Sequence, residues 1–355
     1  MIATELQKQV SAKVETAGWR KLVSSSLRPL GSRKRVLIIG NGELAKQVCQ
    51  ALLAHRKQPW EVVGFLCADP SRVGRRIGGT HVLGTMEQLF ETVERYEVNI
   101  VAICLEDRRA VLPVQTLLDF KAMGLGVVDG IELYEQVSGR LSIDQLKPSA
   151  LIFSHGFQRL ATIMGLKRLI DLVAASLGLV LLLPIGLLVA ALIKLDSRGP
   201  IFYRQTRVGL HGKPYVMWKF RSMTQDAESD GVRWATLGDP RATRVGRCLR
   251  KLRIDELPQL WNVVRGEMSL IGPRPERPVF VQELRGYIPF YDVRHTVRPG
   301  ITGWAQIRFG YAASADDTHV KLQYDLYYVK NLSVLLDLRI LLETVRVVLG
   351  GKGAR

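Results

Sequence analysis

The sequence predicts an α/β protein of two domains: a parallel-sheet domain over residues 34–150 and a mixed, loop-rich α+β domain over residues 166–355. Three observations predict this class. Strand-like apolar runs alternate with helical stretches in the first region, one long uncharged segment follows, and the remainder is dense in Gly, Pro, Arg and aromatic residues. A chain of 355 residues has room for two domains. Its apolar share of 47% and charged share of 23% exclude a mainly disordered protein.

The charge balance indicates an anionic partner. The chain has 50 Lys and Arg against 33 Asp and Glu, a net charge of +17. Nucleic acid, an anionic lipid surface and a phosphorylated small molecule all suit such a balance. Over half of the excess lies in residues 198–300, where arginines are scattered between Gly and Pro. Scattered arginines at turns favour discrete phosphate groups over a nucleic-acid duplex.

Cysteine and histidine spacing argues against two other kinds of site. The four cysteines include no Cys-x-x-Cys pair and mostly lie in apolar stretches, so we expect reduced core side chains. The six histidines show no His-Glu-x-x-His spacing, which disfavours an intrinsic zinc site.

The first domain is predicted from β-branched apolar runs separated by helical stretches. The strand candidates are residues 35–40, 61–67, 99–105 and 126–129, and the helical candidates are residues 46–53, 86–96 and 110–123. Such alternation indicates a parallel sheet covered on both faces. Residues 1–33 are a polar leader or linker without the apolar region of a secretory signal, and residues 151–165 are a second linker.

A glycine turn follows the first strand candidate. Gly40-Asn41-Gly42-Glu43-Leu44-Ala45 has the spacing of the turn that holds a dinucleotide in Rossmann-like domains, so Gly40 and Gly42 are a candidate nucleotide turn. The carboxylate expected about 20 residues later is missing, because position 60 is Trp. A tight strand-to-helix turn that binds no nucleotide is the alternative, and it is the more frequent one.

The uncharged segment Leu172–Ile193 is long enough, at roughly 33 Å, to cross a hydrocarbon core. Leu183-Pro184 lies in its middle, and each arm on either side reaches about one leaflet. Basic residues flank both ends, which places both ends on the cytoplasmic side. We therefore predict a re-entrant membrane helix over about residues 168–195, bent at Leu183-Pro184. A buried core helix is the alternative.

Two adjacent carboxylates, Asp255 and Glu256, carry the strongest chemical signal. They follow Arg250, Lys251 and Arg253 and precede an apolar helical face, so Asp255 is predicted in an N-cap-like position. A capping pair that offsets the helix dipole is the usual meaning of such a pattern. The surrounding cations favour a charged ligand instead, with one carboxylate attacking phosphorus while the other holds a divalent metal.

Further cationic residues are candidates for binding phosphate. Lys219 and Arg221 lie at strand spacing in Lys219–Met223, where we expect both on one face. Arg274 and Arg298 lie in turns stiffened by proline, which fixes the backbone before the guanidinium meets a ligand. Each such turn alone is more often a surface feature.

Together these residues resemble the bacterial sugar transferase family, the monotopic polyprenyl-phosphate glycosyl-1-phosphate transferases of cell-surface polysaccharide synthesis. The matching pieces, besides the proline-broken segment, are Gly199–Gln205, Lys219–Met223, Asp255–Gln259, Gly272–Pro275 and Arg298–Gly303. The resemblance runs from about residue 165 to the end. Residues 34–150 look like the Rossmann-like domain that precedes the catalytic domain in large, exopolysaccharide-type members.

The resemblance implies a two-step phosphoryl transfer at the cytoplasmic face of the bacterial inner membrane. Asp255 would attack the sugar-linked phosphate of a UDP-sugar, expel UMP, and pass the phospho-sugar to undecaprenyl phosphate. Asp255 and Glu256 would hold Mg²⁺, or Glu256 would assist proton transfer. Phosphate charge would be received by Lys219, Arg221, Arg250, Arg274 and Arg298. Nucleic acid is not an expected partner, whereas a homodimer contact through residues 34–150 is left open.

Two departures from the family pattern stand out. Large members usually begin with four spanning helices, and the first 33 residues contain none, so we expect a natural short form or a trimmed chain. Many relatives have Ser before the helix-breaking proline, where this chain has Leu183.

Two other functions are weighed against this one. A sugar-nucleotide dehydratase or reductase built on the first domain would use the glycine turn, but it lacks the acidic residue at position 60. A basic nucleic-acid binder would show steep salt dependence, but no recognition motif supports it and the uncharged segment opposes it.

Overall fold

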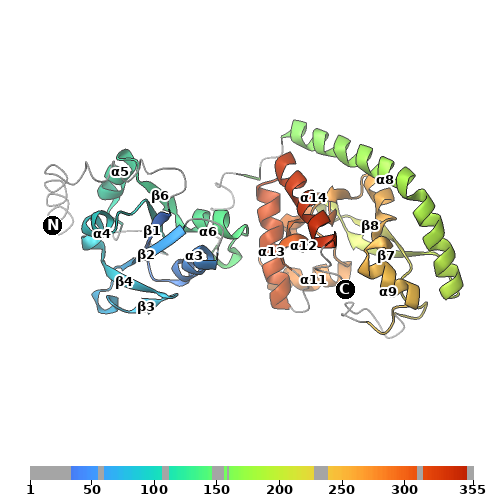
Figure 1. Ribbon diagram of the computed structural model, residues 1–355, viewed down its shortest axis with the longest axis horizontal. Coiled ribbons are helices and arrows are strands. Elements are labelled where there is room, and N and C mark those ends of the chain that lie inside the picture. The colour runs from blue at the N-terminus through green and yellow to red at the C-terminus, as the bar shows by residue number, and fades with distance from the viewer. Residues whose placement is uncertain are drawn as a thin grey trace. The chain divides into compact units, whose positions relative to one another are not determined.

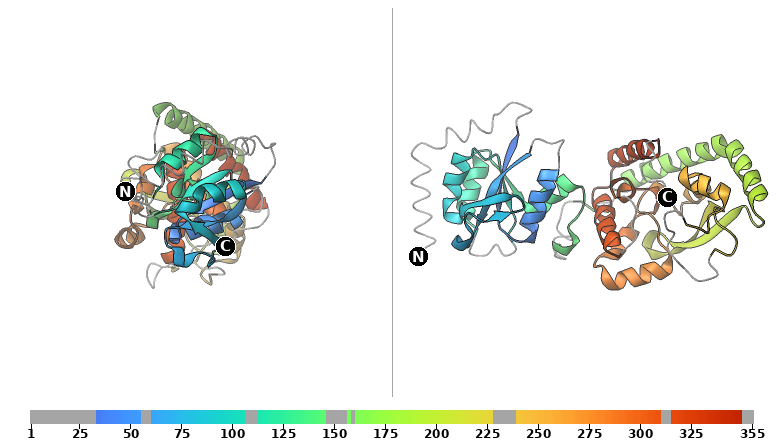
Figure 2. Two further views of the ribbon diagram at one scale, coloured as in Figure 1. Left: turned by 90° about the vertical axis from the view of Figure 1, so that its left-hand side faces the viewer. Right: turned by 60° about the horizontal axis from the view of Figure 1, so that its bottom comes forward.

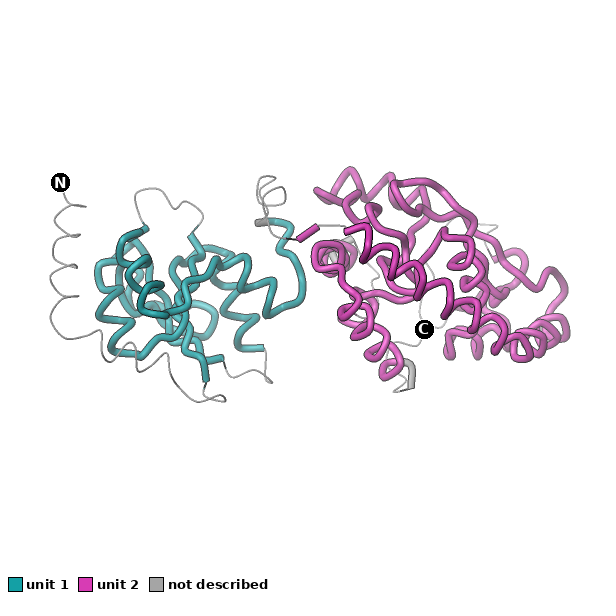
Figure 3. Tube along the Cα trace, turned by 90° about the horizontal axis from the view of Figure 1, so that it is seen from above, with its two compact units in different colours: residues 1–145 teal, residues 146–355 magenta. Residues whose placement is uncertain are grey.

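The computed structural model describes residues 33–54, 60–105, 112–145, 156–157, 160–227, 239–309 and 315–349. The chain divides into two compact units, residues 1–145 and 146–355 (Figure 3). The predicted leader lies outside the described residues apart from Arg33, as do residues 151–155 of the predicted second linker.

The first unit is built on a six-stranded sheet. Its strands are β1 (Lys34–Ile39), β2 (Trp60–Cys67), β3 (Arg76–Ile77), β4 (Thr80–Thr85), β5 (Ile100–Ile103) and β6 (Gly126–Asp129). The strand order is β3-β4-β2-β1-β5-β6, parallel throughout except for the antiparallel pair β3 and β4. The predicted parallel sheet is confirmed, and the hairpin β3-β4 is an addition that the pattern of apolar runs did not predict.

Helices cover both faces of this sheet (Figure 1). They are α3 (Glu43–Ala54), α4 (Leu89–Arg95), α5 (Val114–Ala122) and α6 (Gly130–Ser138). Alternate side chains of β1 enter different cores: Val36 and Ile38 pack with α3 and α6, whereas Leu37 and Ile39 pack with α4 and α5. This alternation follows from the two-residue period of a strand and explains why the buried part of β1, Val36–Ile39, is apolar without interruption.

Gly40 is required by packing where β1 ends. Its φ of +116° lies in the region that favours glycine, and a Cβ there would stand 2.6 Å from the carbonyl oxygen of Cys104. The helix α3 begins three residues later, as the strand–turn–helix pattern predicts.

The second unit opens with the long helix α8 (Ala161–Asp196) and continues through short elements. These are β7 (Phe202–Val208), β8 (Pro214–Phe220), α9 (Arg244–Lys251), α10 (Gln259–Arg265), β9 (Ser269–Ile271), α11 (Pro278–Tyr287), β10 (Gly300–Thr302), α12 (Trp304–Arg308), α13 (Ala315–Lys330) and α14 (Val334–Leu349). The strands β7 and β8 form an antiparallel ribbon, and β9 pairs with β10 in parallel. The mixed α and β character predicted for this region is confirmed.

The helix α8 is long and apolar enough to cross a membrane, and it is continuous through Pro184. It runs along the border of its unit and arches over its length (Figures 1 and 2). Its buried residues form a narrow stripe, namely Lys167, Asp171, Ala175, Val189 and Ile193. Most of its large apolar side chains are exposed, including Leu183, and only 11% of its most apolar stretch is buried. The alternative of a buried core helix is therefore wrong.

Both ends of α8 are attached to the same unit by side chains. Near the start, Lys167 Nζ donates to Asp337 Oδ2 at 2.7 Å and to the carbonyl of Ile271 at 3.0 Å. At the other end, Asp196 Oδ2 accepts from the backbone N–H of Val245 at 3.1 Å. Lys167 thus has a buried structural partner, a role that the charge pattern of the sequence did not reveal.

Candidate functional site

The two adjacent carboxylates lie in a tight turn between α9 and α10. Residues Ile254–Glu256 form the 3₁₀ turn η5, which starts after Arg253 in the left-handed conformation (φ 56°). The N-cap-like position predicted for Asp255 is wrong, because α10 begins only at Gln259. Pro258 has no N–H to donate, so backbone bonding around it takes the tighter i to i+3 form before the α-helix is established.

Glu256 is surrounded by cations. Its Oε1 accepts from Arg274 Nη2 at 2.6 Å and from Lys219 Nζ at 3.4 Å, and its Oε2 lies 4.0 Å from Arg253 Nη1. Burial by itself would raise the pKa of this carboxyl, but Arg274 and Lys219 hold the pKa well below its ordinary value. Glu256 is therefore an anion at every physiological pH.

Asp255 differs from its neighbour in having no fixed partner among the residues that the structure describes. Its carboxylate is buried and makes no hydrogen bond or ion pair with any side chain in the described part of the chain. Burial raises the pKa of Asp255, the adjacent Glu256 adds to the rise, and Lys219 opposes it. The two carboxylates thus have separate roles, one held in place by ion pairs and one left open to a ligand.

Strand β8 delivers Lys219 to this site. Lys219 pairs with Tyr203 of β7 in the ribbon, and both side chains share the face that also carries Gln205 and Arg207. Burial lowers the pKa of Lys219, and the charge of Glu256 opposes that shift. The ion pair with Glu256 thus favours the charged form of a lysine that burial disfavours.

Arg274 is fixed by its turn as well as by its ion pair. The carbonyl of Arg274 accepts from Arg294 Nη2 at 2.7 Å, and the preceding Gly272 lies so close to the turn after Arg298 that a Cβ would meet the Arg298 carbonyl oxygen at 2.4 Å. The charge of Glu256 raises the pKa of Arg274. The two proline-flanked turns predicted from the sequence are thus packed against each other.

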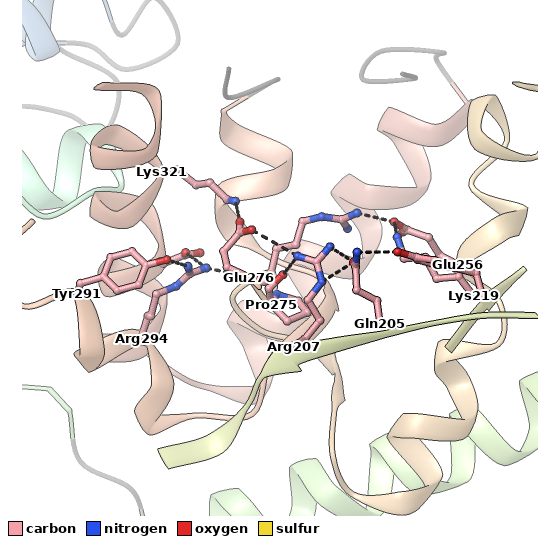
Figure 4. Close-up of polar contacts among 12 residues, drawn as sticks. Gln205, Arg207, Lys219, Glu256, Pro275, Glu276, Tyr291, Arg294 and Lys321 are labelled. Carbon is pink, nitrogen blue, oxygen red and sulfur yellow. Dashed lines mark hydrogen bonds and ion pairs between the residues drawn. The ribbon is translucent and has the colours of Figure 1, made fainter. Parts of the chain in front are cut away.

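A second set of buried charges extends from this turn, and sequence reasoning did not identify it (Figure 4). Glu276 accepts from Lys321 Nζ at 2.7 Å and lies 3.5 Å from Arg207 Nη1. Arg294 Nη2 lies 2.8 Å from Asp325 Oδ2, with both side chains almost completely buried. Despite burial, Lys321 and Arg207 lower the pKa of Glu276 to about 2. Two sequence patterns could have indicated this set: Glu276, two residues after Arg274, and the pair Lys321 and Asp325, four residues apart in α13.

Among the predicted phosphate-binding residues, Arg250 lies near the open carboxylate. Its charge is one of those that lower the pKa of Asp255. Its Nη1 atom is buried and has no hydrogen-bond partner in the described ranges. A buried guanidinium nitrogen without a partner is costly, so a ligand oxygen at this position would be stabilising.

Arg221 and Arg298 are engaged by backbone carbonyls instead. Arg221 lies one residue past β8 and donates to the carbonyls of Ser197 and Arg198 just after α8, so it does not join Lys219 at the carboxylates. Arg298 Nε donates to the carbonyl of Gly266 at 2.9 Å, where α10 ends. Both arginines tie loops together around the site.

Comparison with known proteins identifies the family. The sequence model of the bacterial sugar transferase family matches residues 162–351, more than half of the chain. This chain belongs to the bacterial sugar transferase family. The resemblance recognised from the motifs is thereby confirmed, and the matched range contains all of α8 except its first residue, both carboxylates and both proline-flanked turns.

Individual relatives support the same family. The chain is 48% identical over 225 residues to the UDP-N-acetylgalactosamine-undecaprenyl-phosphate N-acetylgalactosaminephosphotransferase of Aeromonas hydrophila. The aligned residues make up 63% of this chain and 52% of that protein. It is 35% identical over 340 residues to the UDP-glucose:undecaprenyl-phosphate glucose-1-phosphate transferase of Escherichia coli (strain K12). That alignment covers 93% of this chain and 69% of that protein. It is also 47% identical over 194 residues to an uncharacterized sugar transferase of Bacillus subtilis (strain 168), covering 54% of this chain and 90% of that protein. The chain thus spans about half of the first relative's length and about two-thirds of the second's.

Proposed function

We propose that the protein transfers a sugar-1-phosphate from a UDP-sugar to undecaprenyl phosphate and releases UMP. The names of its relatives from Aeromonas hydrophila and Escherichia coli support these two substrates. The observation that carries the proposal is the difference between the paired carboxylates: Glu256 is bound by cations, whereas the buried Asp255 is left without a hydrogen bond among the described residues.

In the first step, an oxygen of the Asp255 carboxylate attacks the phosphorus that carries the sugar. A P–O bond forms to Asp255, the P–O bond to the bridging oxygen breaks, and UMP leaves with that oxygen and its electron pair. An anion attacking an anionic phosphate needs compensating charge. Lys219, Arg250 and Arg274 supply it, and in a buried site their fields are weakly screened.

In the second step, a phosphate oxygen of undecaprenyl phosphate attacks the same phosphorus. The new P–O bond yields the diphosphate-linked sugar, and the bond to Asp255 breaks to regenerate the carboxylate. Splitting one transfer into two displacements is the usual purpose of a covalent intermediate. After this step the Asp255 carboxylate is again an anion near Lys219, Arg250 and Arg274.

Mg²⁺ is proposed as the metal, with Asp255 as its protein ligand. The described residues contain no cluster of three His, Cys, Asp or Glu side chains that could hold a metal. Mg²⁺ commonly binds through one or two carboxylates together with substrate phosphates, so a single open carboxylate fits it. Glu256 fits less well because its Oε1 is engaged by Arg274 and Lys219. When bound with the diphosphate, the ion would neutralise phosphate charge.

The attachment of α8 supports a re-entrant position in the cytoplasmic face of the inner membrane. Lys167 and Asp196 bind the same unit at opposite ends of the helix. A spanning helix would carry one of these ends to the far side of the bilayer. A helix that keeps both ends on one side and exposes apolar side chains between them is suited to enter a single leaflet.

The structure of the first unit supports a Rossmann-like fold but gives no argument for a bound nucleotide. The order β4-β2-β1-β5-β6 is the order of doubly wound nucleotide-binding domains, which supports the Rossmann-like prediction. The close approach of Cys104 accounts for glycine at position 40, so Gly40 supplies no argument for a bound nucleotide. The nucleotide turn at Gly40 and Gly42 and a homodimer contact through this unit stay predictions.

The function is tested by measuring UMP release by the full chain in detergent with Mg²⁺, undecaprenyl phosphate and a panel of UDP-sugars. We expect UMP and lipid-linked product in equal amounts for one or few sugars, and their loss in Asp255→Asn. The matched control is Asp226→Asn, which changes an exposed carboxylate of the same unit. Full activity of Asp255→Asn, or UMP release without any lipid-linked product, would reject the proposal.

A further inference from the structure

A buried amide, that of Gln259, follows Asp255 by about one helical turn. Gln259 is only 2% exposed, and its Nε2 atom makes no hydrogen bond with any described residue. A buried donor left unsatisfied costs roughly 1–3 kcal/mol. Such groups are rare in folded proteins, and a bound ligand is one of their common explanations.

The backbone places Gln259 one turn after Asp255. Leu257 (φ −56°, ψ −38°) and Pro258 (φ −62°, ψ −14°) are both helical, so the turn η5 runs into α10 without a break. Both η5 and α10 contact β8. Gln259 therefore follows Asp255 by about one turn of a helical segment that lies against this strand.

The next turn of this segment shows what it packs against. Asn262 accepts from the backbone N–H of Trp218 at 3.0 Å and donates to the carbonyl of Val216 at 2.7 Å. These atoms belong to β8, the strand that carries Lys219 to the carboxylates. Along the chain, Gln259 thus lies between Asp255 and Asn262, which is hydrogen-bonded to β8.

We propose that the side-chain amide of Gln259 donates a hydrogen bond to a phosphoryl oxygen of the group that Asp255 accepts, and that it acts beside Arg250. This assignment rests on the proposed function. Arg250 has the same property as Gln259, a buried nitrogen without a partner in the described part of the chain. Two unsatisfied donors from α9 and α10, one before and one after Asp255, match the several acceptor oxygens of a phosphoryl group.

The proposal is tested with Gln259→Met, which keeps the size of the side chain and removes its donor. Because Nε2 has no partner among the described residues, an apolar group of similar shape should leave the Tm unchanged or raise it. The rate of UMP release in a single turnover without acceptor should fall at least tenfold, as it does when one donor to a developing charge is removed. Gln282→Met, at an exposed position of α11, is the control and should match the wild type in both measurements.

A Gln259→Met rate within about threefold of the wild type would overturn the proposal. If that variant does not fold, Gln259→Asn and Gln259→Leu decide, because both side chains have four heavy atoms branched at Cγ and only Asn keeps an amide. A faster turnover for Asn than for Leu supports a hydrogen-bonding role, whereas equal rates reject it. Wild-type UMP release is measured alongside, so the failure of the proposed function is distinguished from the failure of this assignment.

Discussion

Arg274 donates a 2.6 Å hydrogen bond to Glu256, which commits the cation of one proline-flanked turn to the carboxylate beside the open Asp255. This ion pair therefore sets the position of Asp255 relative to the positive charge of Arg274. Arg294, which is paired with Asp325, donates to the carbonyl of Arg274. The buried charges around Asp325 and Glu276 therefore help to position Arg274. The arrangement explains why Arg294 is buried and Arg274 largely shielded from solvent although neither lies in an α-helix or a strand.

Replacing Glu256 by Gln should slow the enzyme and shift its pH profile. Removing the negative charge beside Asp255 lowers the pKa of Asp255, because a like-charge neighbour no longer opposes ionisation. The acid limb of UMP release should move to lower pH, while the plateau rate falls by roughly 10- to 100-fold because Arg274 loses its anchor. Glu283→Gln, exposed on α11, serves as the control in the same profile. A shift of the acid limb to higher pH would contradict this account of Asp255.

Removing one member of the buried Arg294–Asp325 pair should destabilise the second unit strongly. Both side chains are at most 3% exposed, and an unpaired buried charge costs about 3–5 kcal/mol. Asp325→Asn should therefore lower the free energy of unfolding by about 3 kcal/mol. Arg265→Gln, which breaks a pair at a half-exposed arginine, should cost less than about 1 kcal/mol. Equal losses in the two variants, measured by chemical denaturation, would contradict the importance of the buried pair.

Glu276 should contribute stability that is lost in acid. Its folded-state pKa of about 2 lies below the ordinary value of about 4.5, so its contribution is present above pH 4.5 and disappears as the pH falls toward 2. The full contribution is about 3 kcal/mol by linkage. The difference in unfolding free energy between wild type and Glu276→Gln should therefore narrow from pH 6 to pH 3. A difference that stays constant over that range would refute the ion-pair account.

Both ends of α8 should face the cytoplasm. Single cysteines at Thr162 and Arg198, exposed positions near the two ends, report this once the exposed Cys248 is changed to Ser. The cysteines at 49, 67 and 104 are buried and should not react. A membrane-impermeant maleimide should label both positions in inverted vesicles and neither in intact spheroplasts. Labelling of one position from each side would establish a spanning helix and reject the re-entrant one.

Sequence reasoning identifies the elements that have strong local signals. The strands of the first unit follow from their β-branched runs, and α8 follows from the absence of charge. The hairpin β3-β4 escapes such reasoning because residues 76–85 hold few consecutive apolar residues, and its pairing with β2 is decided by tertiary contacts. The predicted start of α10 is misplaced because one proline changes the local bonding.

The candidate site is predictable in part for a similar reason. The adjacent carboxylates and the Arg-bearing turns are local patterns, so the order of residues alone is enough to recognise them. Which cation meets which carboxylate depends on contacts between residues far apart in the chain. Arg274 reaches Glu256, whereas Arg221 turns to the end of α8 and Arg298 to the end of α10. Lys321 and Glu276 lie 45 residues apart, so the local patterns around each of them do not indicate that they pair.

The central claim is that Asp255 becomes esterified to the phosphate of the donor sugar, and mass spectrometry of the intact protein tests it most directly. Incubated with Mg²⁺ and its UDP-sugar but without undecaprenyl phosphate, the wild type should gain the mass of one sugar phosphate. Peptide analysis should place it on Asp255, and added undecaprenyl phosphate should remove it. A protein that turns over its substrates yet never carries this mass, or carries it on another residue, would contradict the account.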